Sequence, residues 1–270
     1  MTTNIAINGA NGRMGRALVQ ACAENSQSVL VAALVRQGSE FEGMDAGTVA
    51  GIAPANLPML ADKSQMPRDV QVWIDFTLPE GLMEALQFCV ANKIPMVIGT
   101  TGLNDQQIQA IHNAGNNIPI VFAPNMSVGV NLCLSILQTA AKTLGEDYDI
   151  EIVEAHHKNK VDAPSGTALR MGEVIADSLG VDLDEKAEYT RHGNIGARKA
   201  GTIGFQTIRA GDIVGEHTVT FAGVGERVEI AHKASSRLTF ARGAVRAANW
   251  LVGKDNGVYD MQDVLGLSQK

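Results

Sequence analysis

The chain has 270 residues, of which 45% are hydrophobic and 19% charged, and its formal net charge is −7. This composition is that of a globular protein rather than a disordered one, and the length favours two domains over one. The acidic balance argues against a general nucleic-acid surface, and no run approaches the roughly 18 apolar residues of a membrane span.

Short apolar runs alternate with helix-period stretches in the first half of the chain. The expected strands are 5–8, 29–35, 70–77, 95–102 and 118–125, and the expected helices are 13–24, 82–92 and 103–115. This alternation predicts βαβ units and a parallel sheet that is buried on both faces. The segment 46–69 has no clear period, and we expect it to be a looped excursion.

The second half has a different pattern. A long helix is expected at 128–145 and a strand at 148–157, with Ile150, Ile152 and, less clearly, Glu154 on one face. The further expected elements are a helix at 167–179, three strands within 201–211, 212–223 and 226–235, and a helix within 236–254. Three consecutive strands without helices between them predict an antiparallel or mixed sheet, so this half is an α+β domain.

Two features bear on the compartment. The N-terminus runs straight into a strand and lacks the basic and apolar regions of a signal peptide. Cys22, Cys89 and Cys133 are widely spaced among apolar residues, which fits buried free thiols and matches no zinc or C-x-x-C pattern. We therefore expect a cytoplasmic protein without a metal site.

Three glycines follow the first expected strand and precede a helix. Gly9 is placed for a tight turn, Gly12 for close approach of a pyrophosphate, and Gly15 for close helix–strand packing. The helix start would then direct free N–H groups at the phosphates. The spacing is G-x-x-G-x-x-G, so a glycine-rich turn without a ligand is the alternative. With this turn, the first domain is expected to be a Rossmann-like parallel-sheet domain.

The end of the second strand bears on which dinucleotide binds. Val35 and Arg36 stand where an NAD-preferring site places a carboxylate for the ribose hydroxyls. A guanidinium suits a 2′-phosphate, and Arg13 is a second candidate cation, so NADPH is favoured over NADH. The alternative is that Arg36 is a solvated loop residue. A Val35→Glu change is expected to move the preference towards NADH.

Two further loops follow the fourth and fifth strands. They are "GTTG" at 99–102 and "APNMSVG" at 123–129. Ligands of open α/β sheets bind at the carboxyl ends of the strands, although such loops are equally often structural.

The stretch "EAHHKNKVDAPSGTAL" places cationic and titratable side chains directly before a helix start. Histidine exchanges protons near neutral pH, and lysine is a compact cation for a carboxylate. Ser165 is a candidate N-cap, with Gly166 and Thr167 in the first turn, and such a helix start captures anions. The alternative is a capped helix after a charged loop. A dinucleotide site combined with an anion site and a proton donor indicates a reductase.

Seven stretches together resemble the 4-hydroxy-tetrahydrodipicolinate reductase (dihydrodipicolinate reductase) family over nearly the whole chain. They are "GANGRMGR", "DFTLPEG", "VIGTTG", "NMSVGVN", "EAHHKNKVDAPSGTAL", "GTIGFQTIRAGDIVGEHTVTF" and "ERVEIAHKASSR". The E-x-H-H-x-x-K-x-D-x-P-S-G-T-A block is highly specific to that family. The resemblance implies NAD(P)H-dependent reduction of a cyclic imine dicarboxylate in the diaminopimelate route to lysine.

The resemblance also implies roles for individual residues. His156 would be the acid/base residue and Lys160 a second proton donor, while His157, Gly166 and Thr167 would bind the substrate carboxylates. The implied cofactor contacts are Gly9, Ala10, Asn11, Gly12, Arg13, Met14, Arg36, Gly99, Thr100, Thr101, Ala123, Pro124, Asn125 and Met126. Some members carry Glu at the position of Val35 and use both cofactors.

The family's architecture supplies the expected domain limits. Residues 1–126, completed by 237–270, would form the dinucleotide-binding domain, and residues 127–236 would bind substrate and build a homotetramer.

Two other functions stay open. One is an amino-acid or semialdehyde dehydrogenase, although the semialdehyde reaction usually needs a reactive cysteine and Cys133 fits core packing. The other is an NADPH-sensing regulator, which would need no positioned proton donors.

Overall fold

The computed structural model describes residues 2–267, apart from the side chain of Glu146. The chain divides at Val128/Gly129 and at Ser236/Arg237 into two compact units. The segments before Gly129 and after Ser236 together form what we call the discontinuous domain, and residues 129–236 form the inserted domain. These limits lie within two residues of the expected ones, although Met1 and residues 268–270 of the expected segments are outside the described residues.

The discontinuous domain is built on a six-stranded parallel sheet in the order β11-β5-β4-β3-β1-β2. The strands are β1 (Thr3–Asn8), β2 (Ser28–Leu34), β3 (Val72–Asp75), β4 (Met96–Ile98), β5 (Pro119–Phe122) and β11 (Gly257–Tyr259). The chain moves outward from β1 first to β2 and then, in the other direction, to β3. A reversal of this kind opens a crevice at the carboxyl ends of the strands, where open α/β sheets bind ligands.

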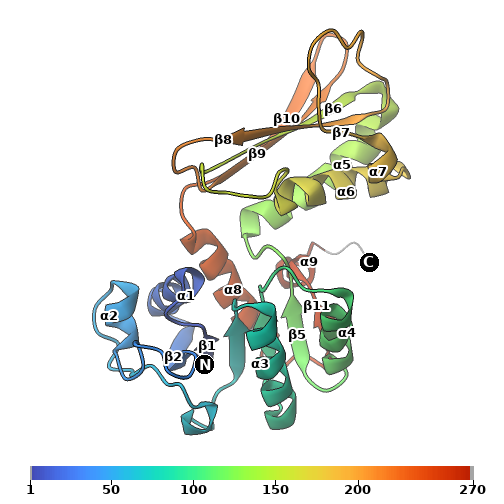
Figure 1. Ribbon diagram of the computed structural model, residues 1–270. Coiled ribbons are helices and arrows are strands. Elements are labelled where there is room, and N and C mark those ends of the chain that lie inside the picture. The colour runs from blue at the N-terminus through green and yellow to red at the C-terminus, as the bar shows by residue number, and fades with distance from the viewer. Residues whose placement is uncertain (1, 268–270) are drawn as a thin grey trace. The chain divides into compact units, whose positions relative to one another are not determined.

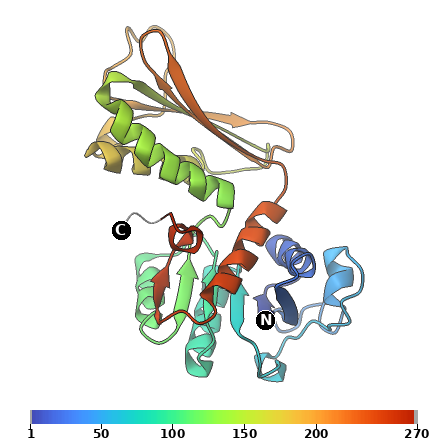
Figure 2. The same ribbon diagram turned by 180° about the vertical axis from the view of Figure 1, so that it is seen from behind.

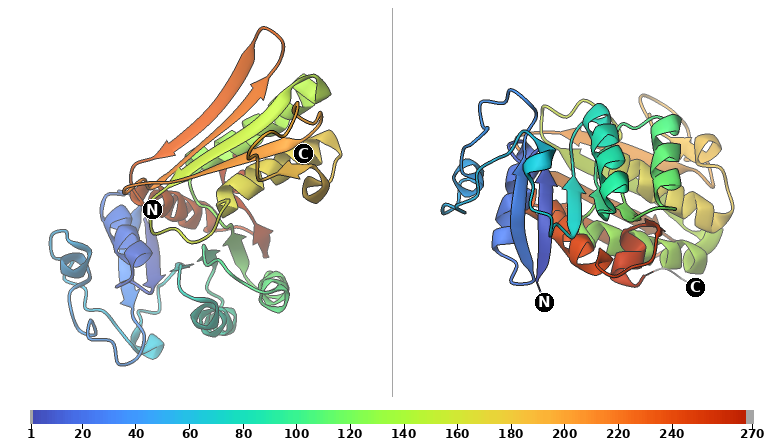
Figure 3. Two further views of the ribbon diagram at one scale, coloured as in Figure 1. Left: turned by 45° about the horizontal axis from the view of Figure 1, so that its top comes forward. Right: turned by 90° about the horizontal axis from the view of Figure 1, so that it is seen from below.

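Helices cover both faces of this sheet (Figure 1; Figure 3, right). One face packs against α1 (Arg13–Ala23), α2 (Ala46–Ala50), α8 (Leu238–Leu251) and α9 (Met261–Leu265). The other packs against α3 (Pro79–Asn92) and α4 (Asp105–Ala114). The strands read as continuous apolar runs because they are buried on both sides. The predicted Rossmann-like sheet is therefore confirmed.

The last long helix of the chain, α8, belongs to the core of the discontinuous domain. Its buried face consists mostly of small residues, which let it lie close to α1. At Gly243, α8 also lies close to the segment after β5, because a Cβ there would lie 1.7 Å from the carbonyl oxygen of Met126. No side chain other than hydrogen fits at this position.

The inserted domain has one mixed sheet and one layer of helices, seen from two sides in Figures 1 and 2. Its sheet order is β10-β9-β6-β8-β7, and the central strand β6 pairs parallel with β8 and antiparallel with β9. The strands are β6 (Asp149–His156), β7 (Ala187–Glu188), β8 (Ile203–Arg209), β9 (Gly215–Ala222) and β10 (Arg227–Ala234). The helices are α5 (Val128–Leu144), α6 (Gly166–Leu179) and α7 (Leu183–Lys186), with a 3₁₀ turn at Gly145–Asp147. The predicted mixed sheet is confirmed.

The expected looped excursion at 46–69 is more ordered than its sequence suggested. Asp45 caps α2 by accepting a hydrogen bond from the Thr48 amide, and a 3₁₀ turn forms at Lys63–Gln65. Between them, Leu60 makes a parallel bridge with Leu34, so this stretch extends the sheet beyond β2. The rest of the segment is a loop, as expected. The bridge was missed because it depends on hydrogen bonds to distant backbone, which local periodicity does not report.

Element limits also differ at several points. The helix α3 begins at Pro79, where proline suits a first turn, rather than at residue 82. The fourth strand covers only Met96–Ile98, and the short β11 and α9 were not expected. Within residues 2–267, no helix combines the length and the apolar character that crossing a bilayer would require.

Candidate functional site

The glycine-rich turn after β1 has the local geometry that its spacing predicts. Gly9 adopts a left-handed conformation with φ +67°, and Gly12 is the N-cap of α1 without a side-chain cap. A Cβ on Gly15 would lie 2.1 Å from the carbonyl oxygen of Gly9, so α1 can start against the turn only if residue 15 has no side chain. The first amides of α1 lack intrahelical acceptors and are available to an anion. The cradle therefore fits a dinucleotide phosphate.

A cleft of about 1000 Å³ opens beside this turn in the discontinuous domain. Its walls come from the ends of β1 and β2, from the segment before the 3₁₀ turn, and from the start of α3. The expected cofactor residues that it brings together are Gly9, Asn11, Gly12 and Arg36. Arg36 is exposed at the rim, and the Val35 side chain beside it is only 4% exposed.

The other expected cofactor residues lie outside the lining of this cleft. Arg13 is an exposed residue in the first turn of α1, so the expected second cation is not part of the cleft wall. Several of the remaining side chains are buried in the core and could meet a ligand only through their backbone, namely Ala10, Thr100, Ala123 and Met126. The cleft lining also lacks the last five expected cofactor residues, which are Met14, Gly99, Thr101, Pro124 and Asn125.

Lys63 is a cleft residue that the sequence did not single out. It lies in the 3₁₀ turn, and its Nζ is 3.7 Å from a carboxylate oxygen of Glu84. Carboxylates share the lining with Arg36 and Lys63, namely Glu42, Asp62, Glu80 and Glu84. The cleft thus offers two cations to a phosphate within an otherwise acidic rim.

Asp75, at the end of β3, joins the loops around the cleft. Its carboxylate is completely buried and accepts hydrogen bonds from the Asn8 side chain at 2.8 Å and the Thr100 hydroxyl at 3.1 Å. It also accepts from the Thr77 amide at 2.9 Å and the Thr77 hydroxyl at 2.7 Å. One carboxylate thereby fixes the loops that follow β1, β3 and β4.

In the inserted domain, the His–Lys block follows β6 and leads into α6. The strand ends at His156 and the helix starts at Gly166, with Ser165 as its N-cap, as predicted. The Ser165 hydroxyl accepts a hydrogen bond from the Ala168 amide at 3.2 Å and lies 3.0 Å from Nε2 of His217. Gly166 and Thr167 occupy the first turn of α6.

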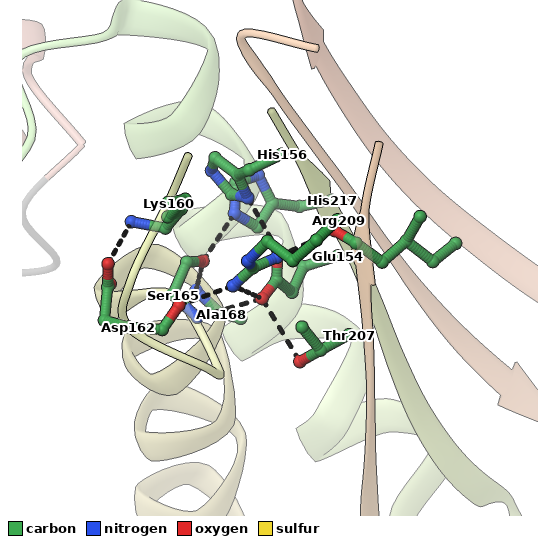
Figure 4. Close-up of polar contacts among 10 residues, drawn as sticks. Glu154, His156, Lys160, Asp162, Ser165, Ala168, Thr207, Arg209 and His217 are labelled. Atoms are coloured by element: carbon green, nitrogen blue, oxygen red, sulfur yellow. Dashed lines mark hydrogen bonds and ion pairs between the residues drawn. The ribbon is translucent and has the colours of Figure 1, made fainter. Parts of the chain in front are cut away.

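Glu154 lies at the centre of this arrangement (Figure 4). Its carboxylate is 2.6 Å from Nδ1 of His156 and forms a two-pronged ion pair with Arg209, at 2.9 and 2.8 Å. The sequence did not identify Glu154, Arg209 or His217 as site residues. The available signal was the weak continuation of the Ile150–Ile152 alternation to Glu154, which placed a carboxylate on the buried face of β6.

The pKa of His156 lies below the usual value for histidine. Burial is the largest cause, the hydrogen bond and charge of Glu154 raise the pKa again, and the charges of Lys160 and Arg209 lower it. Burial also lowers the pKa of the neighbouring His217, to about 4. Burial therefore disfavours the imidazolium of His156 more than the charge of Lys160 does.

The other expected substrate residues lie in the loop between β6 and α6. The Lys160 Nζ is 2.7 Å from a carboxylate oxygen of Asp162. His157 has a buried Nδ1 without a hydrogen-bond partner among residues 2–267. Within the same residues, no group of three or more His, Cys, Asp or Glu side chains is arranged to hold a metal ion.

Comparisons with known proteins show which family the chain resembles. "Dihydrodipicolinate reductase, N-terminus" matches residues 3–126, and "Dihydrodipicolinate reductase, C-terminus" matches residues 129–265. The 4-hydroxy-tetrahydrodipicolinate reductase of Hahella chejuensis is 58% identical, covering 98% of this chain and 99% of its own. That of Alkalilimnicola ehrlichii is 57% identical, covering 99% and 100%.

A solved structure matches as well. The dipicolinate-bound dihydrodipicolinate reductase of Paenisporosarcina sp. TG-14 is 25% identical with a TM-score of 0.76, covering 97% of this chain and 99% of that one. The two family models match both halves of the chain, and these relatives cover 97–99% of it. The chain belongs to the dihydrodipicolinate reductase family, whose members are nicotinamide-dependent oxidoreductases of lysine biosynthesis.

Proposed function

We propose that the protein reduces 4-hydroxy-tetrahydrodipicolinate to tetrahydrodipicolinate, with loss of water, at the expense of NADPH or NADH. The observation that carries this proposal is the His–Lys block. It joins a buried histidine to the start of α6, in a chain 58% identical to a reductase of that name. The bound nicotinamide supplies a hydride, and the protein must supply a proton and hold a dianionic substrate.

The residues of the inserted domain suit these two tasks. His156 is the proposed proton donor and Lys160 the second one, while His157, Gly166 and Thr167 bind the substrate carboxylates. The buried, unpartnered Nδ1 of His157 supports the role of that ring as a ligand, because a buried polar atom without a partner is costly. The first amides of α6 favour an anion for the same reason as those of α1.

The test follows NADPH and NADH oxidation by absorbance while the substrate is made in place from pyruvate and aspartate semialdehyde by the preceding synthase. We expect rapid oxidation that depends on the synthase. Tight NADPH binding without oxidation of either cofactor would mean that the dinucleotide site is correct and the proposed chemistry is not.

Cofactor preference is best tested at Arg36. Val35 is part of the domain core, so a Val35→Glu change would bury a carboxylate as well as alter recognition. We expect Arg36→Ala to weaken NADPH binding by about 10- to 100-fold, the value of a hydrogen bond to a charged group, and to leave NADH binding nearly unchanged. Titration of both cofactors by fluorescence measures this, and Arg68→Ala serves as the matched control, because Arg68 is an exposed arginine of the same domain outside the cleft lining. Equal losses for both cofactors would show that Arg36 does not read the 2′-phosphate.

The competing functions fit the site less well. Burial raises the pKa of the Cys133 thiol, which disfavours the thiolate that a semialdehyde dehydrogenase would need. A cofactor sensor would have no use for a histidine held between Glu154 and the start of α6.

We also propose that the protein works in the cytoplasm.

A homotetramer is the proposed assembly. The family resemblance implies it, and α5 and α6 cover only one face of the sheet in the inserted domain. Two apolar side chains of this sheet, Val228 in β10 and Ile208 in β8, are each at least 40% exposed. Sedimentation velocity at micromolar concentration is expected to give a species of four chains, and a monomer would reject the assembly.

A further inference from the structure

We propose that Glu154 is a positioning residue that fixes His156 so that Nε2 is the nitrogen carrying the transferable proton. The same carboxylate ties the ring to the start of the anion-binding helix α6. This inference rests on the proposed function and gives a role to Glu154, a residue of the motif to which the family resemblance assigned none.

The contacts of Glu154 reach both parts of the site. Oε2 is 2.6 Å from Nδ1 of His156, while Oε1 accepts a hydrogen bond at 3.1 Å from the backbone amide of Ser165, the N-cap of α6. The Thr207 hydroxyl also donates to Oε1, at 3.2 Å. The side chain of Glu154 is 1% exposed, so these contacts, with those of Arg209, replace its water.

Glu154 is held as a carboxylate despite its burial. Burial alone would raise its pKa, but the hydrogen bonds from Arg209 and His156, together with their charges, hold the pKa below its usual value. A carboxylate accepts hydrogen bonds and donates none, so the nitrogen facing it must carry a proton. Nδ1 of His156 is therefore the donor to Glu154 in both charge states of the ring.

The opposite edge of the His156 ring is consequently the reactive one. The hydrogen bond between Glu154 and this ring is made at Nδ1. Within residues 2–267, Nε2 of the ring has no hydrogen-bond partner. When the imidazolium gives its Nε2 proton to the substrate, it keeps the Nδ1 proton, and Glu154 remains ionised. The overall balance is one hydride from the reduced nicotinamide, one proton from Nε2 and one water released.

The surrounding strand leaves the ring little freedom to turn. The His217 ring on β9 meets His156 edge-on, with 5.1 Å between the ring centroids. A Cβ on Gly215 would lie 3.1 Å from Nε2, so β9 approaches the ring at a residue without a side chain. A flipped ring would place its Cδ2 carbon where Nδ1 now faces Glu154, and the hydrogen bond to the carboxylate would be lost.

Glu154 also affects the pH dependence. The charged or titratable groups that face His156 are Glu154 on β6, Arg209 on β8, His217 on β9 and Lys160 in the following loop. Glu154 is the one among them that raises the pKa of His156. A proton donor is active below its pKa, so kcat/KM should fall as pH rises through that pKa. Removing the Glu154 charge should move this fall to lower pH.

The decisive comparison is Glu154→Gln against Glu151→Gln. Glu151 lies on the same strand and is likewise paired with arginine, in its case with Arg191 and Arg198, but its hydrogen-bond and ion-pair partners do not include His156. We expect Glu154→Gln to lower kcat by about 10- to 100-fold, as loss of one charge-assisted hydrogen bond allows, and to shift the alkaline fall of kcat/KM to lower pH. Glu151→Gln should keep the wild-type kcat and pH profile, and both variants should bind NADPH as the wild type does. Equal loss of kcat in the two variants, or an unshifted profile in Glu154→Gln, would overturn the proposal.

A second measurement does not depend on whether a Glu154 variant folds. Nitrogen-15 NMR of the wild-type protein labelled at histidine reports which ring nitrogen carries the proton in the neutral state, and a His156→Gln sample assigns the signal. We expect neutral His156 to carry its proton on Nδ1; a proton on Nε2 would overturn the proposal. If the wild-type protein binds NADPH but reduces nothing, the proposed function fails, whereas the NMR result still tests the Glu154–His156 pairing.

Discussion

Replacing His156 with glutamine is expected to lower kcat by roughly 10²–10⁴, the usual contribution of a positioned acid or base. Glutamine keeps a polar side chain of similar reach but cannot release a proton near neutral pH. NADPH affinity should not change, because the residues around the dinucleotide cleft all belong to the discontinuous domain. Steady-state kinetics with the coupled synthase gives kcat, and fluorescence titration gives the dissociation constant of NADPH.

His112→Gln is the matched control for this substitution. His112 is exposed on α4 and has no part in the site, so its variant should behave as the wild type. If His156→Gln retained full kcat, the proton donor would have to be sought elsewhere, with Lys160 the next candidate. If it lost NADPH binding instead, the assignment of the two sites to separate domains would be wrong.

Gly15→Ala is expected to disable the dinucleotide turn altogether. The new Cβ would lie 2.1 Å from the Gly9 carbonyl oxygen and 2.6 Å from the Ala10 Cα, both backbone atoms that cannot step aside. Such overpacking should lower the free energy of unfolding by about 3 kcal/mol. Moving the turn away from α1 should also weaken NADPH binding by about 100-fold, because it misplaces at least two amides that would bind the phosphates.

Gly166→Ala separates this effect from the mere addition of a methyl group to a helix start. A Cβ on Gly166, in the first turn of α6, would meet nothing within 4 Å. The Gly166→Ala variant should have the unfolding free energy and the NADPH affinity of the wild type. Its KM for the substrate tests the proposed carboxylate contact. Denaturant unfolding measures the stability of both variants, and cofactor titration measures their NADPH affinity. A Gly15→Ala protein with the stability of the wild type would mean that α1 can shift to make room.

The elements that the sequence predicted well are those whose signals are local. The alternation of apolar runs with helices specified the parallel sheet, and the glycine spacing specified the turn at Gly9. Ser165 was recognised as a cap because N-caps depend on residue type and on the following helix alone. His156 and Lys160 were also singled out from a local signal, a dense and unusual motif, and their roles stay predictions.

The residues that sequence reasoning missed act through partners far away in the chain. Glu154 is separated from Arg209 by 55 residues, and the Ser165–His217 pair by 52. Lys63 reaches the cleft because Leu60 pairs with Leu34, and this pairing has no periodic signature. A buried carboxylate in an apolar strand was the one local sign of the Glu154 cluster, and it is ambiguous without knowledge of the opposite strand.

The return of the chain to its first domain has a consequence for biosynthesis. Residues of α8 and α9, between Ala241 and Val264, complete the core that begins with β1 and α1, and β11 adds the last strand beside β5. During translation the N-terminal segment must therefore wait, with part of its apolar surface uncovered, until nearly the whole chain has left the ribosome. The inserted domain needs no later residue for its sheet and can fold earlier, so the usual order in which the N-terminal domain folds first would be reversed.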